Sequence, residues 1–360
     1  MRLLGLTHII KQFVSIVFVM IVGLISGTIL FKLSVPIPFL LGSVLIIIFA
    51  NKVSIKIQKP SVAISRWMRV IIGVTLGHST AGNLNLFSWS TSFIILLAIL
   101  FTIVITFTGM WFFRPLKGFN KRDLYISSLP GGLSFLISLA GDLGDKFPKI
   151  ALIHATRIIT LVFVLSLMAY FLGVESMTKV NADPFALIVS FDLWTILATI
   201  IVAGAIAEIF KIPGGQVIVG LVLSHIAYSI GFIQIAMPEM MITIAMTYLG
   251  ILLGTSLMQG TNVQYSIIMS MSVAFTLIAL MIGILISFGV VQSVDERFLL
   301  YFLALSPGGI AEISLITLAL GLDVSLVVAV HASRFFFIVL IGSIGMNFLK
   351  NEVTKTTDKE

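Results

Sequence analysis

The chain has 360 residues, of which 59% are hydrophobic and only 10% are charged, and its mean hydropathy is +1.16. A soluble domain carries about 25% charged residues, so this composition excludes a water-soluble enzyme, a fibrous protein and a disordered chain. There is no cysteine, which excludes disulfides, iron–sulfur clusters and cysteine nucleophiles. The net charge of +7 is typical of basic cytoplasmic loops under the positive-inside rule, so we expect no nucleic-acid partner.

Apolar runs long enough to cross a bilayer recur along the chain, since a spanning helix needs roughly 20 residues. The long runs, which we expect to span, cover residues 12–31, 87–113, 148–172, 191–210, 263–291 and 324–348. Shorter runs lie at 36–50 and 61–82, and two further segments, 121–143 and 297–321, are interrupted by Pro-Gly-Gly. The sequence therefore predicts an all-α polytopic protein of the cytoplasmic membrane, in contact with the lipid bilayer.

The two interrupted segments belong to an internal repeat with an offset of 177 positions. Pro130-Gly131-Gly132 recurs as Pro307-Gly308-Gly309, and His154-Ala155-Thr156-Arg157 recurs as His331-Ala332-Ser333-Arg334. The same offset carries Gly73 onto Gly250 and Gly77 onto Gly254. We expect two tandem homologous membrane repeats, at residues 1–172 and 191–349. A polar joint at 173–190 connects them, and a charged cytoplasmic tail follows at 350–360.

The loop charges favour one orientation of the two repeats. If each repeat has about five spanning helices plus a re-entrant hairpin at its Pro-Gly-Gly, the basic residues of 114–122 and 146–149 share one side with the N-terminus. The second repeat is then inverted, and the basic tail also lies on that side. Because basic residues are enriched in cytoplasmic loops, we expect both termini to be cytoplasmic.

The Pro-Gly-Gly breaks are candidate binding elements. Irregular backbone at membrane depth persists only where it is buried in protein or lines a water-filled cavity. The helix after each break directs its N-terminal amides and positive dipole end inward, which favours an anion. The alternative is a packing kink without a ligand.

The paired histidines and arginines follow each break. His154 and Arg157, like His331 and Arg334, are three positions apart and share one helix face. An arginine at the bilayer centre costs about 2.5–3.5 kcal/mol on insertion scales, which argues for a role. The arginines either attract a carboxylate or other anion, or lie near the surface or against a carbonyl and lock the helix to its hairpin.

Acidic residues are scarce in the predicted spans. Glu312 follows the second break, whereas the equivalent position in the first repeat is Phe135. Glu312 either neutralises Arg157 or Arg334, or is a protonatable group that couples transport to a proton gradient. Glu208 is three positions before Lys211, which predicts a surface ion pair.

We expect the substrate-binding residues to be those of the breaks and the arginine-bearing helices. They are Pro130, Gly131, Gly132, Ser134, His154, Arg157, Pro307, Gly308, Gly309, Glu312, His331 and Arg334. The five histidines are not spaced as metal ligands, and no phosphate-binding loop or catalytic triad spacing occurs. We therefore predict no enzyme activity, no metal and no cofactor.

With both copies of this motif, the chain resembles the membrane AbrB family, duplicated integral membrane proteins formerly labelled ammonia monooxygenases. The resemblance rests on Pro130–Ser134 with Leu152–Arg157 and on Pro307–Glu312 with Val330–Arg334, and it covers residues 12–349. Phe135 departs from the family, which usually carries an acidic residue there. The resemblance implies a membrane protein with a link to regulation of gene expression, and it shares only a name with the soluble DNA-binding regulator.

Three functions are open at this point. The first is a secondary transporter of a small anionic metabolite, with or without proton coupling. The second is a membrane regulatory protein that affects gene expression indirectly, and the third is a membrane monooxygenase. We expect a small-molecule substrate as partner, with a homodimer as an open alternative.

Overall fold

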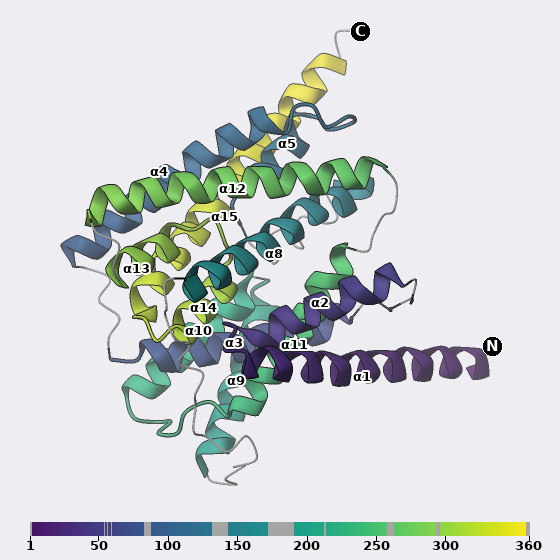
Figure 1. The fold of residues 1–360 in the computed structure, drawn as a ribbon, viewed down its shortest axis with the longest axis vertical. Coiled ribbons are helices and arrows are strands. Elements are labelled where there is room, and N and C mark those ends of the chain that lie inside the picture. Colours follow the sequence, from purple (N-terminus) through teal and green to yellow (C-terminus); the bar gives the residue numbers. More distant parts are fainter. Residues whose placement is uncertain are drawn as a thin grey trace. The chain divides into compact units, whose positions relative to one another are not determined.

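The computed structural model describes most of the chain and is all-helical there. The described residues are 2–53, 55, 57–58, 60–82, 88–131, 143–171, 191–211, 214–257, 263–292 and 296–357. Gly132, Ser134, Phe135 and the predicted joint at 173–190 lie outside them. The described part contains thirteen α-helices and one short 3₁₀ helix, without strands, so the predicted all-α class is confirmed (Figure 1).

The helices have the following bounds. They are α1 (Arg2–Lys32), α2 (Pro38–Lys52), α3 (Val62–Thr80), α4 (Trp89–Phe112), α5 (Lys121–Ser128), α8 (Phe147–Phe171), α9 (Phe191–Ile209), α10 (Gly215–Ser229), α11 (Glu239–Leu257), α12 (Val263–Val291), α13 (Glu296–Leu305), α14 (Ile310–Ala319) and α15 (Val324–Thr357).

Six of these helices are long and apolar enough to cross a membrane, namely α1, α4, α8, α11, α12 and α15. Five coincide with predicted long runs. The predicted run at 191–210 forms α9, whose described apolar stretch Leu193–Ile209 is shorter than a full span. α11 was not among the predicted long runs. Within this helix the Thr247 hydroxyl donates to the Thr243 carbonyl at 2.8 Å, so this polar group is satisfied locally.

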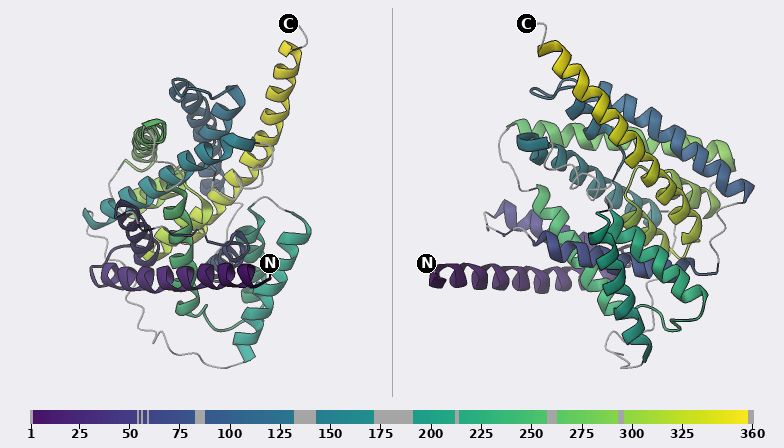
Figure 2. Two further views of the ribbon diagram at one scale, coloured as in Figure 1. Left: turned by 90° about the vertical axis from the view of Figure 1, so that its right-hand side faces the viewer. Right: turned by 180° about the vertical axis from the view of Figure 1, so that it is seen from behind.

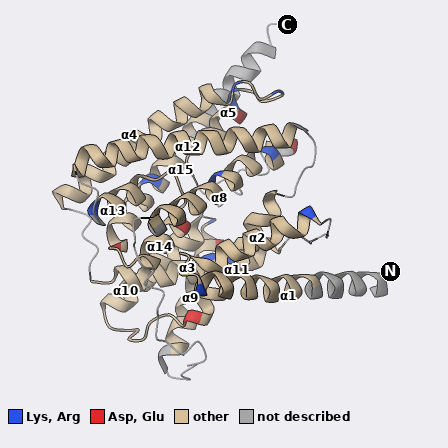
Figure 3. Cartoon of the chain, viewed as in Figure 1, with Lys and Arg blue, Asp and Glu red and all other residues tan. Residues whose placement is uncertain are grey.

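The exposed surface of these helices is apolar, which identifies a multi-pass membrane protein in contact with the bilayer. Charged residues are few along the helices in Figure 3. Trp89 and Trp111 are 88% and 66% exposed near opposite ends of α4. Their separation of 22 residues corresponds to about 33 Å of helix, close to the thickness of a hydrocarbon core. Tryptophan is enriched at membrane interfaces, so these two residues are placed to mark both boundaries.

The chain forms two compact units that interleave in sequence. Unit 1 is Met1–Gly82, Val162–Gly260 and Leu318–Gly321, and unit 2 is Asn83–Leu161, Thr261–Thr317 and Leu322–Glu360. Each unit thus takes helices from both predicted sequence repeats. The repeats at 1–172 and 191–349 stay a prediction about the chain's internal duplication, and they are not the compact units.

Unit 1 contains α1, α2, α3, α9, α10 and α11. α3 packs along α10, while α2 packs against both α1 and α11. α1 is a single straight helix in both views of Figure 2. Val19, Ile47 and Ile251 form a buried apolar cluster that joins α1, α2 and α11.

Unit 2 contains α4, α5, the first part of α8, and α12 to α15. α4 packs against α5, α12, α13 and α15, and α15 also contacts α5 and α13. The Tyr125 hydroxyl of α5 donates to the Ile341 carbonyl of α15 at 2.7 Å. Phe113 contacts Phe112 and Phe275 edge to face, and Phe112 and Phe275 are tilted to each other, between α4 and α12.

Helix bounds in the second part of the chain follow those in the first by 177 positions. Adding 177 to the bounds of α2 (38 and 52) gives 215 and 229, the bounds of α10, and adding it to those of α3 (62 and 80) gives 239 and 257, the bounds of α11. The first residues of α8 and α15, 147 and 324, also differ by 177. The backbone before α2 and α10 is left-handed at equivalent positions, with φ of 43° at Ile37 and 64° at Gly214.

Two helix crossings in unit 1 are related by the same offset of 177 positions, and both depend on a glycine. A Cβ added at Gly73 of α3 would contact the Val217 carbonyl oxygen of α10, and one at Gly250 of α11 would contact the Leu40 carbonyl oxygen of α2. Both the glycines and the carbonyls they meet are 177 positions apart. Small residues let transmembrane helices approach this closely.

Both pairs of helices run parallel. The next glycine of α3, Gly77, lies against Leu221, which is further along α10 than Val217. In the same way Gly254 lies against Ile47, further along α2 than Leu40. In each pair, the residue numbers of the contacting residues increase in the same direction. α3 is therefore parallel to α10, and α11 is parallel to α2.

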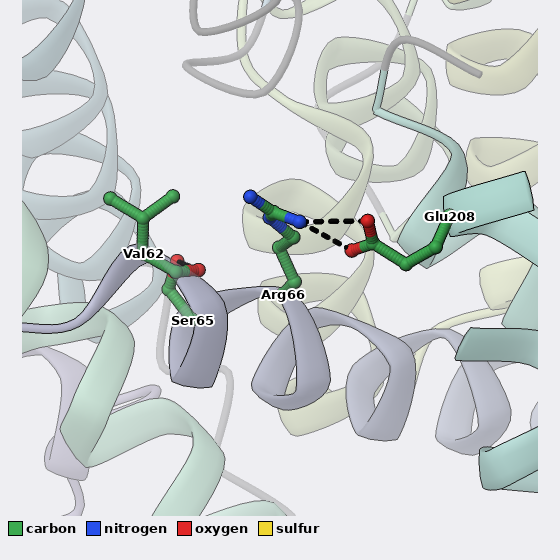
Figure 4. A network of polar contacts seen from close by, with 4 residues as sticks. All are labelled: Val62, Ser65, Arg66 and Glu208. Atoms are coloured by element: carbon green, nitrogen blue, oxygen red, sulfur yellow. Dashed lines mark hydrogen bonds and ion pairs between the residues drawn. The ribbon is translucent and has the colours of Figure 1, made fainter. Parts of the chain in front are cut away.

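Glu208 of α9 pairs with Arg66 of α3, not with Lys211 (Figure 4). Both carboxylate oxygens of Glu208 accept from Nη1 of Arg66 at 2.7 Å. The predicted pair with Lys211 is therefore wrong. Spacing along one helix suggested Lys211, but Lys211 lies beyond the end of α9 with φ of 48°, out of the helical register.

We expect this ion pair to contribute little to stability. The two side chains are 41% and 47% exposed, and exposed pairs contribute about 0.2–1 kcal/mol. Glu208→Gln should lower the thermal unfolding midpoint slightly, and Lys211→Gln should leave it unchanged. A larger effect of Lys211→Gln in thermal unfolding would contradict the assignment.

Candidate functional site

The first break follows α5 and is a tight turn around Pro130. α5 begins with a capping box, in which Asn120 accepts from the Asp123 amide at 2.8 Å and donates its own amide to the Asp123 carboxylate at 3.0 Å. The helix ends at Ser128, and the Gly131 amide donates to the Leu129 carbonyl at 2.8 Å across the proline. The last carbonyls of α5 therefore need partners from elsewhere.

The second break has the same backbone pattern. α13 ends at Leu305, and the Gly308 amide donates to the Ser306 carbonyl at 2.9 Å across Pro307. α14 then begins at Ile310, with its N-terminal end at the break.

Each break is held by the histidine of the helix that follows it. His154 Nε2 lies 3.0 Å from the Ile126 carbonyl oxygen, and His331 Nε2 lies 3.0 Å from the Leu303 carbonyl oxygen. Nη2 of Arg157 is 2.8 Å from His154 Nδ1, and Arg334 repeats this distance with His331. His154 Nδ1 also lies 3.2 Å from the Gly131 carbonyl oxygen, but its contact with Arg157 is shorter. Because arginine can only donate, we assign Nδ1 as the acceptor and Nε2–H as the donor in both imidazoles, which are then neutral.

The arginines bind carbonyls of the breaks. Nη2 of Arg157 donates to the Gly131 carbonyl at 2.8 Å, and Nη2 of Arg334 donates to the Gly308 carbonyl at 2.7 Å. Both residues are only 2% exposed within the protein, and their depth relative to the membrane surface stays a prediction. The contact of each arginine with a carbonyl, which was one of the expected arrangements, is present. A cation near the C-terminal end of α5 or α13 also complements the dipole of that helix.

The two arginines are not equivalent. Nη1 of Arg334 also donates to the Ser306 carbonyl at 2.6 Å, with a longer contact to Leu305 at 3.4 Å. Nε of Arg157 is buried and has no hydrogen-bond partner among the described residues. The hydrogen bonds of the two guanidiniums to backbone are therefore different, although both side chains are almost fully buried.

Each arginine-bearing helix also contacts the opposite break. A Cβ added at Gly308 would lie 3.5 Å from the Leu161 side chain, one turn after Arg157 on α8. Ile338 of α15, one turn after Arg334, packs with Leu129 beside the first break. Leu161 and Ile338 are again 177 positions apart, so both breaks lie against both helices.

Glu312 is half-buried in the first turn of α14, where a negative charge suits the helix dipole. Its carboxylate lies beside Gly309, since a Cβ added at Gly309 would contact Oε2. Its expected neutralisation of Arg157 or Arg334 stays a prediction. A role for Glu312 in proton coupling stays a prediction.

Most predicted site residues are thus gathered in unit 2. The described ones are Pro130, Gly131, His154, Arg157, Pro307, Gly308, Gly309, Glu312, His331 and Arg334. Sequence reasoning missed the carbonyl acceptors at Ile126, Leu303 and Ser306, which have no signal in side-chain chemistry. It also missed Leu161 and Ile338, although both follow an arginine by one helical turn and obey the 177-residue offset.

A metal centre has no support in the described residues, where no three His, Cys, Asp or Glu side chains cluster. The two histidines nearest the breaks use both ring nitrogens for hydrogen bonds.

Comparison with known proteins gives one family. The family model described as "Transition state regulatory protein AbrB" matches residues 39–350. The chain is similar to an Escherichia coli (strain K12) protein named "Putative regulator AbrB", with 22% identity over 327 residues, which cover 89% of this chain and 92% of the relative. No solved structure matches the chain.

Proposed function

The chain belongs to the AbrB family of membrane proteins, as its paired motifs predicted, and from its geometry we propose that it is a secondary transporter of a small anionic metabolite. The observation that carries the proposal is the pair of buried guanidiniums of Arg157 and Arg334, each of which donates to a carbonyl of a backbone break. Intramembrane ionisable residues of this kind typically mark substrate pathways. We propose transport rather than an enzymatic reaction.

An inverted repeat supports transport, because many transporters place their substrate where two inverted repeats meet at broken helices. Helices joined by short connections run antiparallel, as we expect for α10 and α11. Since α3 is parallel to α10, α3 is then antiparallel to α11. α3 and α11 are equivalent helices of the two repeats, 177 positions apart, so opposite directions of these helices mean that the repeats are inverted. The shared helix bounds and the shared hydrogen bonds at both breaks favour duplication and inversion together.

Re-entry of the first broken segment is supported by contacts at its two ends. Nζ of Lys146, just before α8, donates to the Gly118 carbonyl, just before α5, at 2.6 Å. Lys149 donates to Gln264 of α12 at 2.9 Å, and Gln264 donates to the Lys117 carbonyl at 3.1 Å. The segment therefore begins and ends at one basic end of unit 2, which the positive-inside rule would place in the cytoplasm together with the end of α15.

Glu312 is the proposed coupling group. A half-buried carboxylate at the second break can exchange a proton when the charge of a bound substrate enters or leaves. Protonation would change the charge beside α14 from −1 to 0 and so alter the anion affinity of the site. This arrangement would link substrate binding to a proton gradient.

Uptake by the purified protein in liposomes tests the proposal. A panel of labelled acetate, benzoate, succinate and phosphate should contain at least one anion that accumulates in vesicles with protein but not in empty ones. Glu312→Gln should abolish the stimulation of that uptake by a pH gradient, but it should leave exchange of the anion across the membrane intact. Glu208→Gln serves as a matched control in unit 1. Absence of uptake for every anion of the panel would rule out the transporter.

Regulation is the second candidate, because the E. coli relative is named a regulator. A regulatory protein would act through a partner, since no soluble DNA-binding segment is evident in the sequence. It predicts a specific crosslinked protein in intact membranes and no uptake. A monooxygenase instead predicts stoichiometric copper or iron in the purified protein.

A further inference from the structure

We infer that Arg157 is the arginine that binds substrate, that the group it binds is a carboxylate carrying a single negative charge, and that Arg334 is a positioning residue. This inference rests on the proposed transport function and assigns the substrate class and the roles of the two equivalent arginines.

The hydrogen bonds separate the two residues. Arg334 uses both terminal nitrogens on backbone, through the Ser306 and Gly308 carbonyls, and also donates to His331. Arg157 uses Nη2 alone, on Gly131 and His154. Both terminal nitrogens of Arg334 therefore hold its break, while only one terminal nitrogen of Arg157 does so among the described residues.

One buried donor of Arg157, Nε–H, has no hydrogen bond among the described residues. A buried donor of a charged group is costly to leave unpaired, so an acceptor that arrives with a ligand is strongly favoured. Functional sites are where such groups are tolerated.

The charges of the site fit a monoanion. Arg157 and Arg334 contribute +2 and Glu312 contributes −1 when ionised, and both histidines are neutral because their Nδ1 atoms accept hydrogen bonds. The sum over these described groups is +1, which attracts an anion with a single negative charge. A carboxylate neutralises this charge and also matches the planar guanidinium better than a spherical ion does.

The neighbouring contacts place the part of α8 around Arg157 beside both breaks. Leu161, one turn after Arg157, packs against Gly308, so this part of α8 faces the second break as well as the first. A carboxylate at Arg157 would therefore lie close to the N-terminal end of α14, whose dipole also favours an anion. Arg334 fixes the break that presents this end.

Ligand-induced stabilisation of the purified, full-length protein tests the inference. The thermal unfolding midpoint is measured at constant ionic strength with sodium benzoate, acetate and chloride, with benzamide as the neutral analogue of benzoate. The variants are Arg157→Lys and Arg334→Lys, which keep the charge but lose the guanidinium fork, and Arg66→Lys is the matched control in unit 1. We expect a carboxylate to raise the midpoint of the wild-type protein, and chloride and benzamide to have much smaller effects.

Arg157→Lys should weaken the apparent carboxylate affinity at least about tenfold, as expected for loss of a hydrogen bond to a charged group, with a small change in the ligand-free midpoint. Arg334→Lys should mainly lower the ligand-free midpoint and reduce affinity less. The opposite pattern, or an equal response to chloride, would overturn the inference while transport stands. If no anion stabilises the wild-type protein and none is taken up, the proposed function fails as well.

Discussion

Arg334→Leu should destabilise the protein by about 3–5 kcal/mol, because the substitution removes the charged donor from a buried polar network. The carbonyls of Ser306 and Gly308 and the Nδ1 atom of His331 would all lose their donor in a site that is almost fully buried. The exposed Arg114 gives a matched control, since Arg114→Leu removes the same charge without a buried contact. Thermal or denaturant unfolding of both variants in one detergent measures the difference.

Two results would contradict this prediction. The first is an Arg334→Leu protein that unfolds at the wild-type midpoint, which would mean that the backbone at the second break is satisfied without the guanidinium. The second is an equal loss of stability for Arg114→Leu, which would indicate a general effect of charge. Arg334→Lys should fall between leucine and wild type, because an ammonium can keep one of the carbonyl contacts.

Gly73→Val should destabilise unit 1 by about 3 kcal/mol, near the upper end of the usual cost of overpacking. Its Cβ would meet the Val217 carbonyl oxygen and lie 3.1 Å from the Leu221 amide, so the backbone of α10 would have to move. Backbone cannot rotate away as a flexible side chain does, and α3 and α10 would separate. The expected readout is a lower unfolding midpoint and a smaller yield of folded protein.

Gly289→Val is the control for this substitution. Gly289 also lies in a long apolar helix, α12, but a Cβ built there meets nothing within 4 Å. The two variants share the same change in composition and helix propensity, so their difference isolates the close approach of α3 and α10. Equal midpoints for the two variants would show that the crossing tolerates separation.

The break residues show how far sequence reasoning reaches. Pro130 and Pro307 predicted interruptions because proline and glycine alter the local backbone, and the structure has turns at both. The placement of His154 three residues before Arg157 on one face predicted that the two act together, and they are in contact at 2.8 Å. These properties are local, and they can be read from spacing alone.

The same reasoning failed where partners are distant in sequence. Glu208 was assigned to Lys211 by proximity in sequence, yet its partner Arg66 is 142 positions away. The predicted long runs also left out 239–257, a helix in which the hydroxyls of Thr247 and Thr255 donate to carbonyls of the same helix. A sequence does not state which hydrogen-bonding groups are already paired.

The low charge of this chain and its 177-residue offset, both properties of the sequence by itself, determined a multi-pass membrane protein with two interrupted segments and a His–Arg pair after each. The tertiary structure alone decided that helices from both parts of the chain share each compact unit, and that each arginine holds the break 26–28 positions before it. The reason is physical. Hydropathy and helix register are properties of neighbouring residues, whereas backbone carbonyls are the same at every position. Only folding selects which carbonyl receives a guanidinium, and it left the donors of Arg157 and Arg334 unequally used.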